Sequence, residues 1–224
     1  MNIGHLGMTL RQARVLAAAG LALALLLWAP RPAPADEFLT GQLLVAGPNL
    51  ADPNFSQTVV FMLRHDRSGA LGLVVNRPMG TVPLDRLLQA LESAGDDEEP
   101  EPPQPQQGES ADGGPSLPVF YGGPVEPFVG FTLHSRDIML ENSVPVDDET
   151  ALNVQDEALQ ALAEGAAPHQ MIFLLGYSGW GPGQLESELE RGDWYVVEAD
   201  PGLIFSEEPG RTWERAVARF STEL

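Results

Sequence analysis

Cysteine is absent from the 224 residues of this chain. The absence excludes disulfide bonds, thiolate nucleophiles and cysteine-ligated metal sites. It is compatible with export, because a protein that enters an oxidising compartment can simply lack cysteine.

Lysine is absent too: all 12 basic residues are arginines, against 32 acidic residues, and the formal net charge is −20. Nucleic-acid affinity depends largely on basic side chains that neutralise phosphates, so this balance disfavours direct DNA or RNA binding. The acidic surface is expected to keep the protein soluble and well dispersed.

Histidine is scarce, and the pattern of a metal site is missing. Beyond the amino-terminal segment only His65, His134 and His169 occur, in unrelated parts of the chain and without an HExxH motif. A catalytic zinc site usually combines converging histidine and carboxylate ligands. The sequence therefore predicts neither a metal ion nor a cofactor.

The amino terminus has the three-part order of a signal peptide. Two arginines precede the uncharged apolar run Val15–Ala29, and residues 30–35 end in small residues. The run is shorter than the roughly 20 residues of a membrane-spanning helix. We expect cleavage between Ala35 and Asp36, giving a periplasmic or secreted protein without a membrane span. The alternatives are an uncleaved anchor, or a start codon assigned upstream of a cytoplasmic protein.

Aromatic residues are also missing from residues 93–118, which are dense in Pro, Gly, Glu and Asp. Such a segment cannot bury enough apolar area to offset its ordering entropy. We expect a disordered acidic, proline-rich insert at about 93–118 inside a single domain of residues 36–224, because the flanking segments form one core.

Short runs rich in Val, Leu and Phe, bounded by turn residues, predict strands, and apolar residues at helical spacing predict helices. The strands are expected at Gln42–Ala46, Thr58–Arg64, Ala70–Asn76, Val119–Tyr121, Gly130–His134, Met171–Leu175 and Trp194–Glu198. The helices are expected at 84–91, Gln155–Ala163, Gln184–Arg191 and Thr212–Phe220. Because strands come in adjacent pairs, we predict an α+β fold with a mixed, mainly antiparallel sheet of about seven strands and about four short helices.

Three groups of segments are distinctive when taken together. They are GQLLVA (41–46), PNFSQTVV (53–60) and GALGLVVNRP (69–78); YGGPV (121–125) and GFTLHS (130–135); and GYSGWGPGQLE (176–186). In this order they resemble the bacterial YqgE/AlgH family. The resemblance implies a compact fold with a split, partly barrel-like sheet. Some members are named as transcriptional regulators, and no catalytic residues carry over. The export signal and the acidic insert depart from the family pattern.

Candidate site residues gather in turns at the ends of predicted strands, where sites tend to be built on a rigid scaffold. Arg77 is a candidate for bidentate recognition of a carboxylate or phosphate, if 76–78 meets 121–124 in space. Alternatively, Arg77 pairs with a nearby acid. The full set of ligand-binding candidates is Asn76, Arg77, Tyr121, Gly122, Gly123, His134, Tyr177, Ser178, Gly179 and Trp180.

Residues 176–184 predict a glycine-rich turn between a buried strand and a helix, a place where an anion can sit. The Lys of a P-loop is missing, so a rigid turn is the simpler interpretation. Ser178 fails the G-x-S-x-G pattern because Trp180 replaces the last glycine. His134 ends an apolar strand. It is either a hydrogen-bonded structural histidine or a catalytic residue. Trp180, Trp194 and Trp213 are expected to anchor the core.

The leading hypothesis is a non-enzymatic exported domain that binds a small molecule or a protein partner. One alternative is a hydrolase that uses Ser178 or His134. Another is a regulator of gene expression, which would act indirectly if the protein is exported.

Overall fold

The computed structural model describes residues 38–93, 115–154 and 157–220. The predicted signal peptide, its cleavage site at Ala35–Asp36 and most of the predicted insert lie outside the described residues. Among the described residues, no helix is long and apolar enough to cross a membrane.

The described chain contains a sheet of ten strands. The strands are β1 (Gln42–Ala46), β2 (Val59–Asp66), β3 (Gly69–Val74), β4 (Pro78–Pro83), β5 (Ser116–Tyr121), β6 (Val125–Ser135), β7 (Val144–Pro145), β8 (Thr150–Asn153), β9 (Met171–Trp180) and β10 (Trp194–Glu198). The helices are α2 (Leu84–Ser93), α3 (Glu157–Ala163), α4 (Gln184–Glu190), α5 (Pro201–Ile204), the 3₁₀ turn η1 (Pro209–Arg211) and α6 (Thr212–Phe220).

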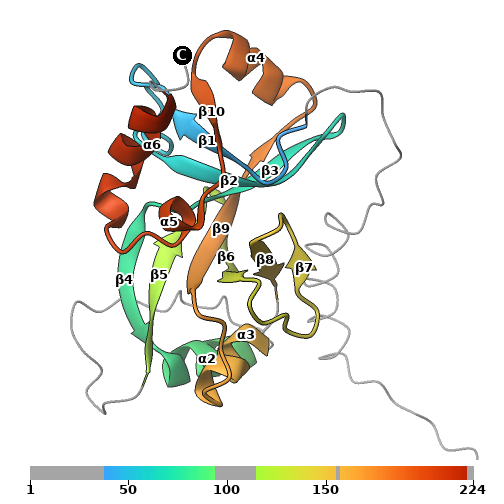
Figure 1. Cartoon of the computed structure of the whole chain (residues 1–224), viewed down its shortest axis with the longest axis vertical. Helices are drawn as coiled ribbons and strands as arrows, with labels where there is room; N and C mark the ends of the chain where they lie inside the picture. The colour runs from blue at the N-terminus through green and yellow to red at the C-terminus, as the bar shows by residue number, and fades with distance from the viewer. Residues whose placement is uncertain (1–37, 94–114, 155–156, 221–224) are drawn as a thin grey trace, which may run out of the picture.

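The sheet follows the order β10-β1-β2-β3-β9-β6-β8-β7, with β4 and β5 branching from β9. Every pair is antiparallel except β5 with β9, which is parallel. β9 is the shared strand: its first half pairs with β5 and β6, and its end pairs with β3. Figure 1 shows β9 running lengthwise through the curled sheet, with helices at both ends. The predicted α+β class with a split, mainly antiparallel sheet is confirmed.

The predicted turn after Gly176 is wrong, because β9 continues to Trp180. Gly176 has φ of +71°, a conformation that glycine adopts without a Cβ penalty. The strand therefore bends there and resumes, and Ser178 and Trp180 pair with β3. The actual connection to α4 is residues 181–183.

The strand β4, which begins at Pro78, was not predicted from the sequence. β4 pairs only with β5, and proline is tolerated as the first residue of an edge strand. The short strands β7 and β8 were not predicted either. All four residues of β8 are buried. Because its first and last residues, Thr150 and Asn153, are polar, the sequence does not show that the strand is buried.

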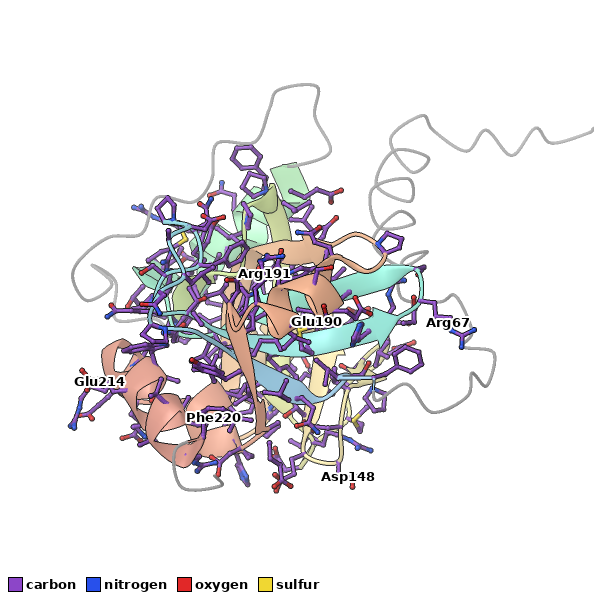
Figure 2. All side chains as sticks on the ribbon, turned by 90° about the horizontal axis from the view of Figure 1, so that it is seen from above. Arg67, Asp148, Glu190, Arg191, Glu214 and Phe220 are labelled. Carbon is purple, nitrogen blue, oxygen red and sulfur yellow. The ribbon has the colours of Figure 1, made fainter. Side chains whose placement is uncertain are left out.

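Alternating residues of β1 supply two cores. Leu43 and Val45 point to the core against which α6 packs, and Leu44 and Ala46 point to the core that contains Leu185 of α4. A third core lies under α2 and α3. Acidic residues of the surrounding elements, including Asp148, Glu190 and Glu214, lie on the outside of the molecule in Figure 2.

The predicted tryptophan anchors are confirmed. Trp180 and Trp194 are buried, with ring centroids 5.9 Å apart, and the ring of Phe55 packs against both. Trp213 of α6 is partly buried and donates a hydrogen bond of 2.9 Å from Nε1 to the Ala46 carbonyl. These contacts tie α6 and the loop before β2 to the sheet.

Candidate functional site

The two turn segments predicted to meet do come together. The Tyr121 N–H donates to the Arg77 carbonyl at 2.9 Å, and the Val74 N–H donates to the Gly122 carbonyl at 2.8 Å. Pro78 pairs with Phe120 at the start of the β4–β5 ladder. The end of β3 and the end of β5 are therefore one structural unit.

Asn76 has a structural role in this unit. Its side chain is buried, accepts a hydrogen bond from the Val59 N–H at 2.8 Å and donates one to the Gln57 carbonyl at 2.9 Å. A side-chain amide thus pairs with the backbone at the start of β2 as a neighbouring strand would. These two hydrogen bonds fix the orientation of the amide.

The alternative prediction was that Arg77 pairs with a nearby acid, but among the described residues it forms no such ion pair. Its Nη2 donates to two backbone carbonyls, Pro53 at 3.0 Å and Ser56 at 2.9 Å. Within the described residues, Nε and Nη1 have no hydrogen-bond partner. The guanidinium is fixed at one corner and retains donors on the other two nitrogens.

The loop that holds Arg77 is itself well supported. The Asp52 carbonyl accepts hydrogen bonds from Phe55 and Ser56, and the Asp52 carboxylate accepts one from the Asn54 N–H at 2.8 Å. The Phe55 ring inserts beside Trp180 and Trp194. Because this loop is closed on itself and anchored in the core, the orientation of Arg77 is set before any ligand arrives.

Tyr121 lies close enough to this guanidinium for their charges to interact. Burial raises the pKa of the Tyr121 phenol, Arg77 opposes the shift, and the carboxylate of Asp52 adds to it. The phenol therefore stays protonated at neutral pH and is available as a donor. We call Asp52, Arg77 and Tyr121 the Arg77 cluster.

The candidate glycines serve the close crossing of two backbones. A Cβ on Gly122 would lie 2.2 Å from the Gly176 carbonyl oxygen, and one on Gly123 would lie 2.2 Å from the Tyr177 carbonyl oxygen. No side chain fits at such a distance. These positions need glycine for packing, whatever the function of the protein.

Ser178, Trp180, Tyr177 and Gly179 lie on β9. Ser178 is buried and donates from Oγ to the Gly122 carbonyl at 3.3 Å, and no histidine of the described chain is hydrogen-bonded to it. Tyr177 packs edge-on against Phe131, with a pKa raised by burial and by Glu126. None of the four shares a hydrogen bond with the Arg77 cluster.

His134 lies elsewhere, on β6, and is fully buried. Its Nδ1 is 2.9 Å from the Ser135 carbonyl oxygen, and its Nε2 is 2.8 Å from Ser143 Oγ. Ser143 also accepts a hydrogen bond of 3.3 Å from Asn153 Nδ2. Sequence reasoning missed Ser143, because it comes near the histidine through the pairing of β8 with both β6 and β7.

Known proteins are similar to this chain over most of its length. The profile of the AlgH-like family matches residues 43–224. The chain belongs to the AlgH-like family. A UPF0301 protein of Beijerinckia indica is 40% identical over 183 residues, covering 81% of this chain and 85% of the relative. One from Caulobacter vibrioides is 40% identical over 185 residues, covering 82% and 87%.

Solved structures agree with this assignment. The solution structure of AlgH from Pseudomonas aeruginosa aligns with a TM-score of 0.63 at 33% identity, covering 84% of this chain and 92% of that one. The crystal structure of a Corynebacterium diphtheriae protein aligns with a TM-score of 0.59 at 20% identity, covering 85% and 90%, and shows the shared fold. The AlgH-like family has no assigned biochemical function.

Proposed function

We propose that this protein is an exported binding domain whose Arg77 cluster recognises one carboxylate or phosphate group on a small ligand or a partner protein. The observation that carries the proposal is the guanidinium of Arg77, which is anchored through Nη2 and keeps Nε and Nη1 unpaired within the described residues. A charged donor that is oriented in advance binds with little ordering cost.

The hydrogen bonds of Arg77 change the type of anion recognition expected from the sequence, which was bidentate. Both N–H groups of Nη2 are engaged by the carbonyls of Pro53 and Ser56. The bidentate fork, which needs Nη2, is therefore occupied. An anionic oxygen would instead receive a charge-assisted hydrogen bond from Nη1 or Nε of Arg77. The protonated hydroxyl of Tyr121 supplies a second donor.

The charge distribution favours a ligand with a single anionic group. The formal net charge of the chain is −20, so polyanions are repelled at long range. Asp52 belongs to the same cluster, and its carboxylate would repel a second negative charge nearby. A monocarboxylate, a phosphomonoester or an acidic side chain of a partner satisfies these limits, whereas nucleic acid does not.

The export part of the proposal rests on the amino terminus. The charged start, the uncharged run Val15–Ala29 and the small residues before Asp36 are supporting features. Cell fractionation with amino-terminal sequencing tests it. A periplasmic chain that starts at Asp36 is expected, and a cytoplasmic chain that starts at Met1 would overturn it.

Ligand-induced thermal shift tests the binding site. Acetate, inorganic phosphate and a phosphomonoester are titrated against the wild-type protein, with sodium chloride at matched ionic strength as the reference. We expect an increase in melting temperature with at least one anion, and we expect Arg77→Gln to abolish it. Tyr121→Phe, which removes only the hydroxyl, is expected to weaken it.

Arg67→Gln is the matched control, because it removes the same charge from the exposed tip of the β2–β3 hairpin (Figure 2). The readout is the ligand-induced shift within each variant, so a lower starting stability of Arg77→Gln does not affect the comparison. A wild-type protein that responds to none of the anions, or a shift that survives Arg77→Gln, would contradict the proposal.

A further inference from the structure

The hydrogen bonds of His134 determine which ring nitrogen carries the proton. The Ser135 carbonyl can only accept, so Nδ1, at 2.9 Å, donates its N–H to it. With that one proton on the ring, Nε2 is an acceptor, and its partner at 2.8 Å is Ser143 Oγ. This is the polarity of a general base that faces a hydroxyl group.

The direction of the Ser143 hydroxyl hydrogen follows from the two partners of Oγ. Asn153 Nδ2 donates to Ser143 Oγ at 3.3 Å and to the Glu141 carbonyl at 3.1 Å, so the serine accepts from the asparagine. The single hydrogen of Ser143 therefore points to His134. A backbone carbonyl here fixes the ring as a carboxylate does in a catalytic triad.

The local backbone presents Ser143 near the surface. The Ser143 N–H donates to the Leu140 carbonyl at 3.2 Å, which closes a turn, and Asn142 within that turn has φ of +59°. Ser143 is half-buried, whereas His134 behind it is fully buried. A hydroxyl at the rim with a shielded base behind it is the arrangement that a nucleophile requires.

An unused polar group lies beside the pair. Thr132 is two residues before His134 on the same face of β6 and pairs directly with Asn153 of β8. It is buried, and within the described residues its Oγ1 has no hydrogen-bond partner. Buried hydroxyl groups are normally paired, so this hydroxyl is available to hydrogen-bond a bound ligand.

We propose that Ser143 is a nucleophile, that His134 is its general base, and that the site accepts the acyl group of an ester. Ile138 and Met139, which precede the turn, are exposed and offer an acyl chain apolar surface on the same loop. Within the described residues, the Ser143–His134 pair shares no hydrogen-bond partner with the Arg77 cluster. The test of one site is therefore independent of the test of the other.

The step is an ordinary acyl transfer. Ser143 Oγ forms a bond to the carbonyl carbon while its proton passes to His134 Nε2, and the carbonyl π electrons move to oxygen. When the tetrahedral intermediate collapses, the bond to the alcohol oxygen breaks, and the alcohol leaves with the proton from His134. Water, deprotonated by the same nitrogen, then releases the acid and regenerates Ser143.

A fluorophosphonate probe tests the nucleophile without knowledge of the substrate. Attack by Ser143 forms an oxygen–phosphorus bond, fluoride leaves, and the proton goes to His134. We expect one addition to the intact protein, located at Ser143 by peptide mass spectrometry. Ser143→Ala and His134→Gln are expected to abolish it, and Ser178→Ala, the control at the buried serine of β9, is expected to retain it.

Because the chain has no cysteine, Ser143→Cys creates a unique thiol and a second test that leaves His134 in place. The rate of alkylation by iodoacetamide against pH gives the thiol pKa. We expect a value at least one unit below the ordinary value of about 8.5. Ser187→Cys, on the exposed face of α4, is the matched control at the ordinary value.

Adding His134→Gln to Ser143→Cys is expected to return the thiol pKa to that of the control. Absence of probe labelling in the folded wild-type protein, labelling of another residue only, or an unshifted thiol pKa would each overturn the proposal. If His134→Gln fails to fold, the pKa of the Ser143→Cys thiol still decides.

Discussion

Glu188 of α4 offers a sharp test of the packing around the tryptophan pair. One of its carboxylate oxygens, Oε2, accepts hydrogen bonds from the indole N–H of Trp180 and of Trp194, both at 2.8 Å. The other oxygen, Oε1, accepts one from Gln184 at 2.9 Å. The carboxylate therefore satisfies two buried donors that come from different strands.

The cost of removing it follows from those two donors. A hydrogen bond to a charged group contributes about 1.5 to 3 kcal/mol, and a buried donor left unpaired costs about 1 to 3 kcal/mol. Partial access of water from the side of α4 brings the estimate to the lower end. We expect Glu188→Ala to lower the free energy of unfolding by about 3 kcal/mol. Glu188→Gln keeps one oxygen as an acceptor and should cost about 1 kcal/mol.

Urea denaturation followed by tryptophan fluorescence measures the effect directly. Glu190→Ala is the control, since it removes the same charge from an exposed position of the same helix (Figure 2). It should change the free energy of unfolding by less than about 0.5 kcal/mol. If Glu188→Ala and Glu190→Ala were equally stable, the shared acceptor would not be holding the two indoles, and the reasoning would fail.

Three further predictions concern backbone crossing, the amide bridge and acid stability. Gly123→Ala places a Cβ 2.2 Å from backbone atoms and should prevent folding. Gly183→Ala, whose Cβ would meet nothing within 4 Å at φ of +73°, should lower the free energy of unfolding by only about 1 to 2 kcal/mol. Thermal melts of the two variants compare them. Asn76→Ala leaves two backbone groups of the β2 start unpaired and should cost about 2 to 4 kcal/mol in urea denaturation. Burial raises the pKa of Asp200, but the hydrogen bond and the charge of Arg219, together with the N–H groups of Gly202 and Leu203, lower it below its usual value. The resulting stability is present above the unfolded-state pKa and is lost as the pH falls through the folded value. Asp200→Asn should therefore cost up to about 1 kcal/mol at pH 7 and nothing near pH 2, and an equal cost at both would refute the pairing.

Local patterns predicted most of the regular elements. β1, β10 and α6 were placed within their observed bounds, because alternation or helical spacing of apolar residues reflects burial on one face. The turn predicted after Gly176 was wrong for a physical reason. Glycine permits a bend in a strand as readily as a turn, and only the pairing with β3 decides between them.

The candidate site was predicted in part. The sequence singled out Arg77, and the proximity of residues 76–78 to 121–124 was confirmed. Its partners were not foreseen, because backbone carbonyls of the 53–56 loop carry no signature in the sequence. Ser143 was missed for a similar reason: it follows an irregular segment, and its histidine is nine residues away on another element.

Composition alone fixed what chemistry is excluded here, since a side chain that is absent cannot act in any fold: no thiol, no ammonium group and few cationic partners for phosphate. Periodicity indicated the buried face of elements such as β1 and α6, because it records solvent exposure locally. The tertiary structure decided which polar groups meet. Those contacts depend on strand register and on the path of loops, which bring together residues such as Arg77 and Ser56, or His134 and Ser143, that no local pattern connects.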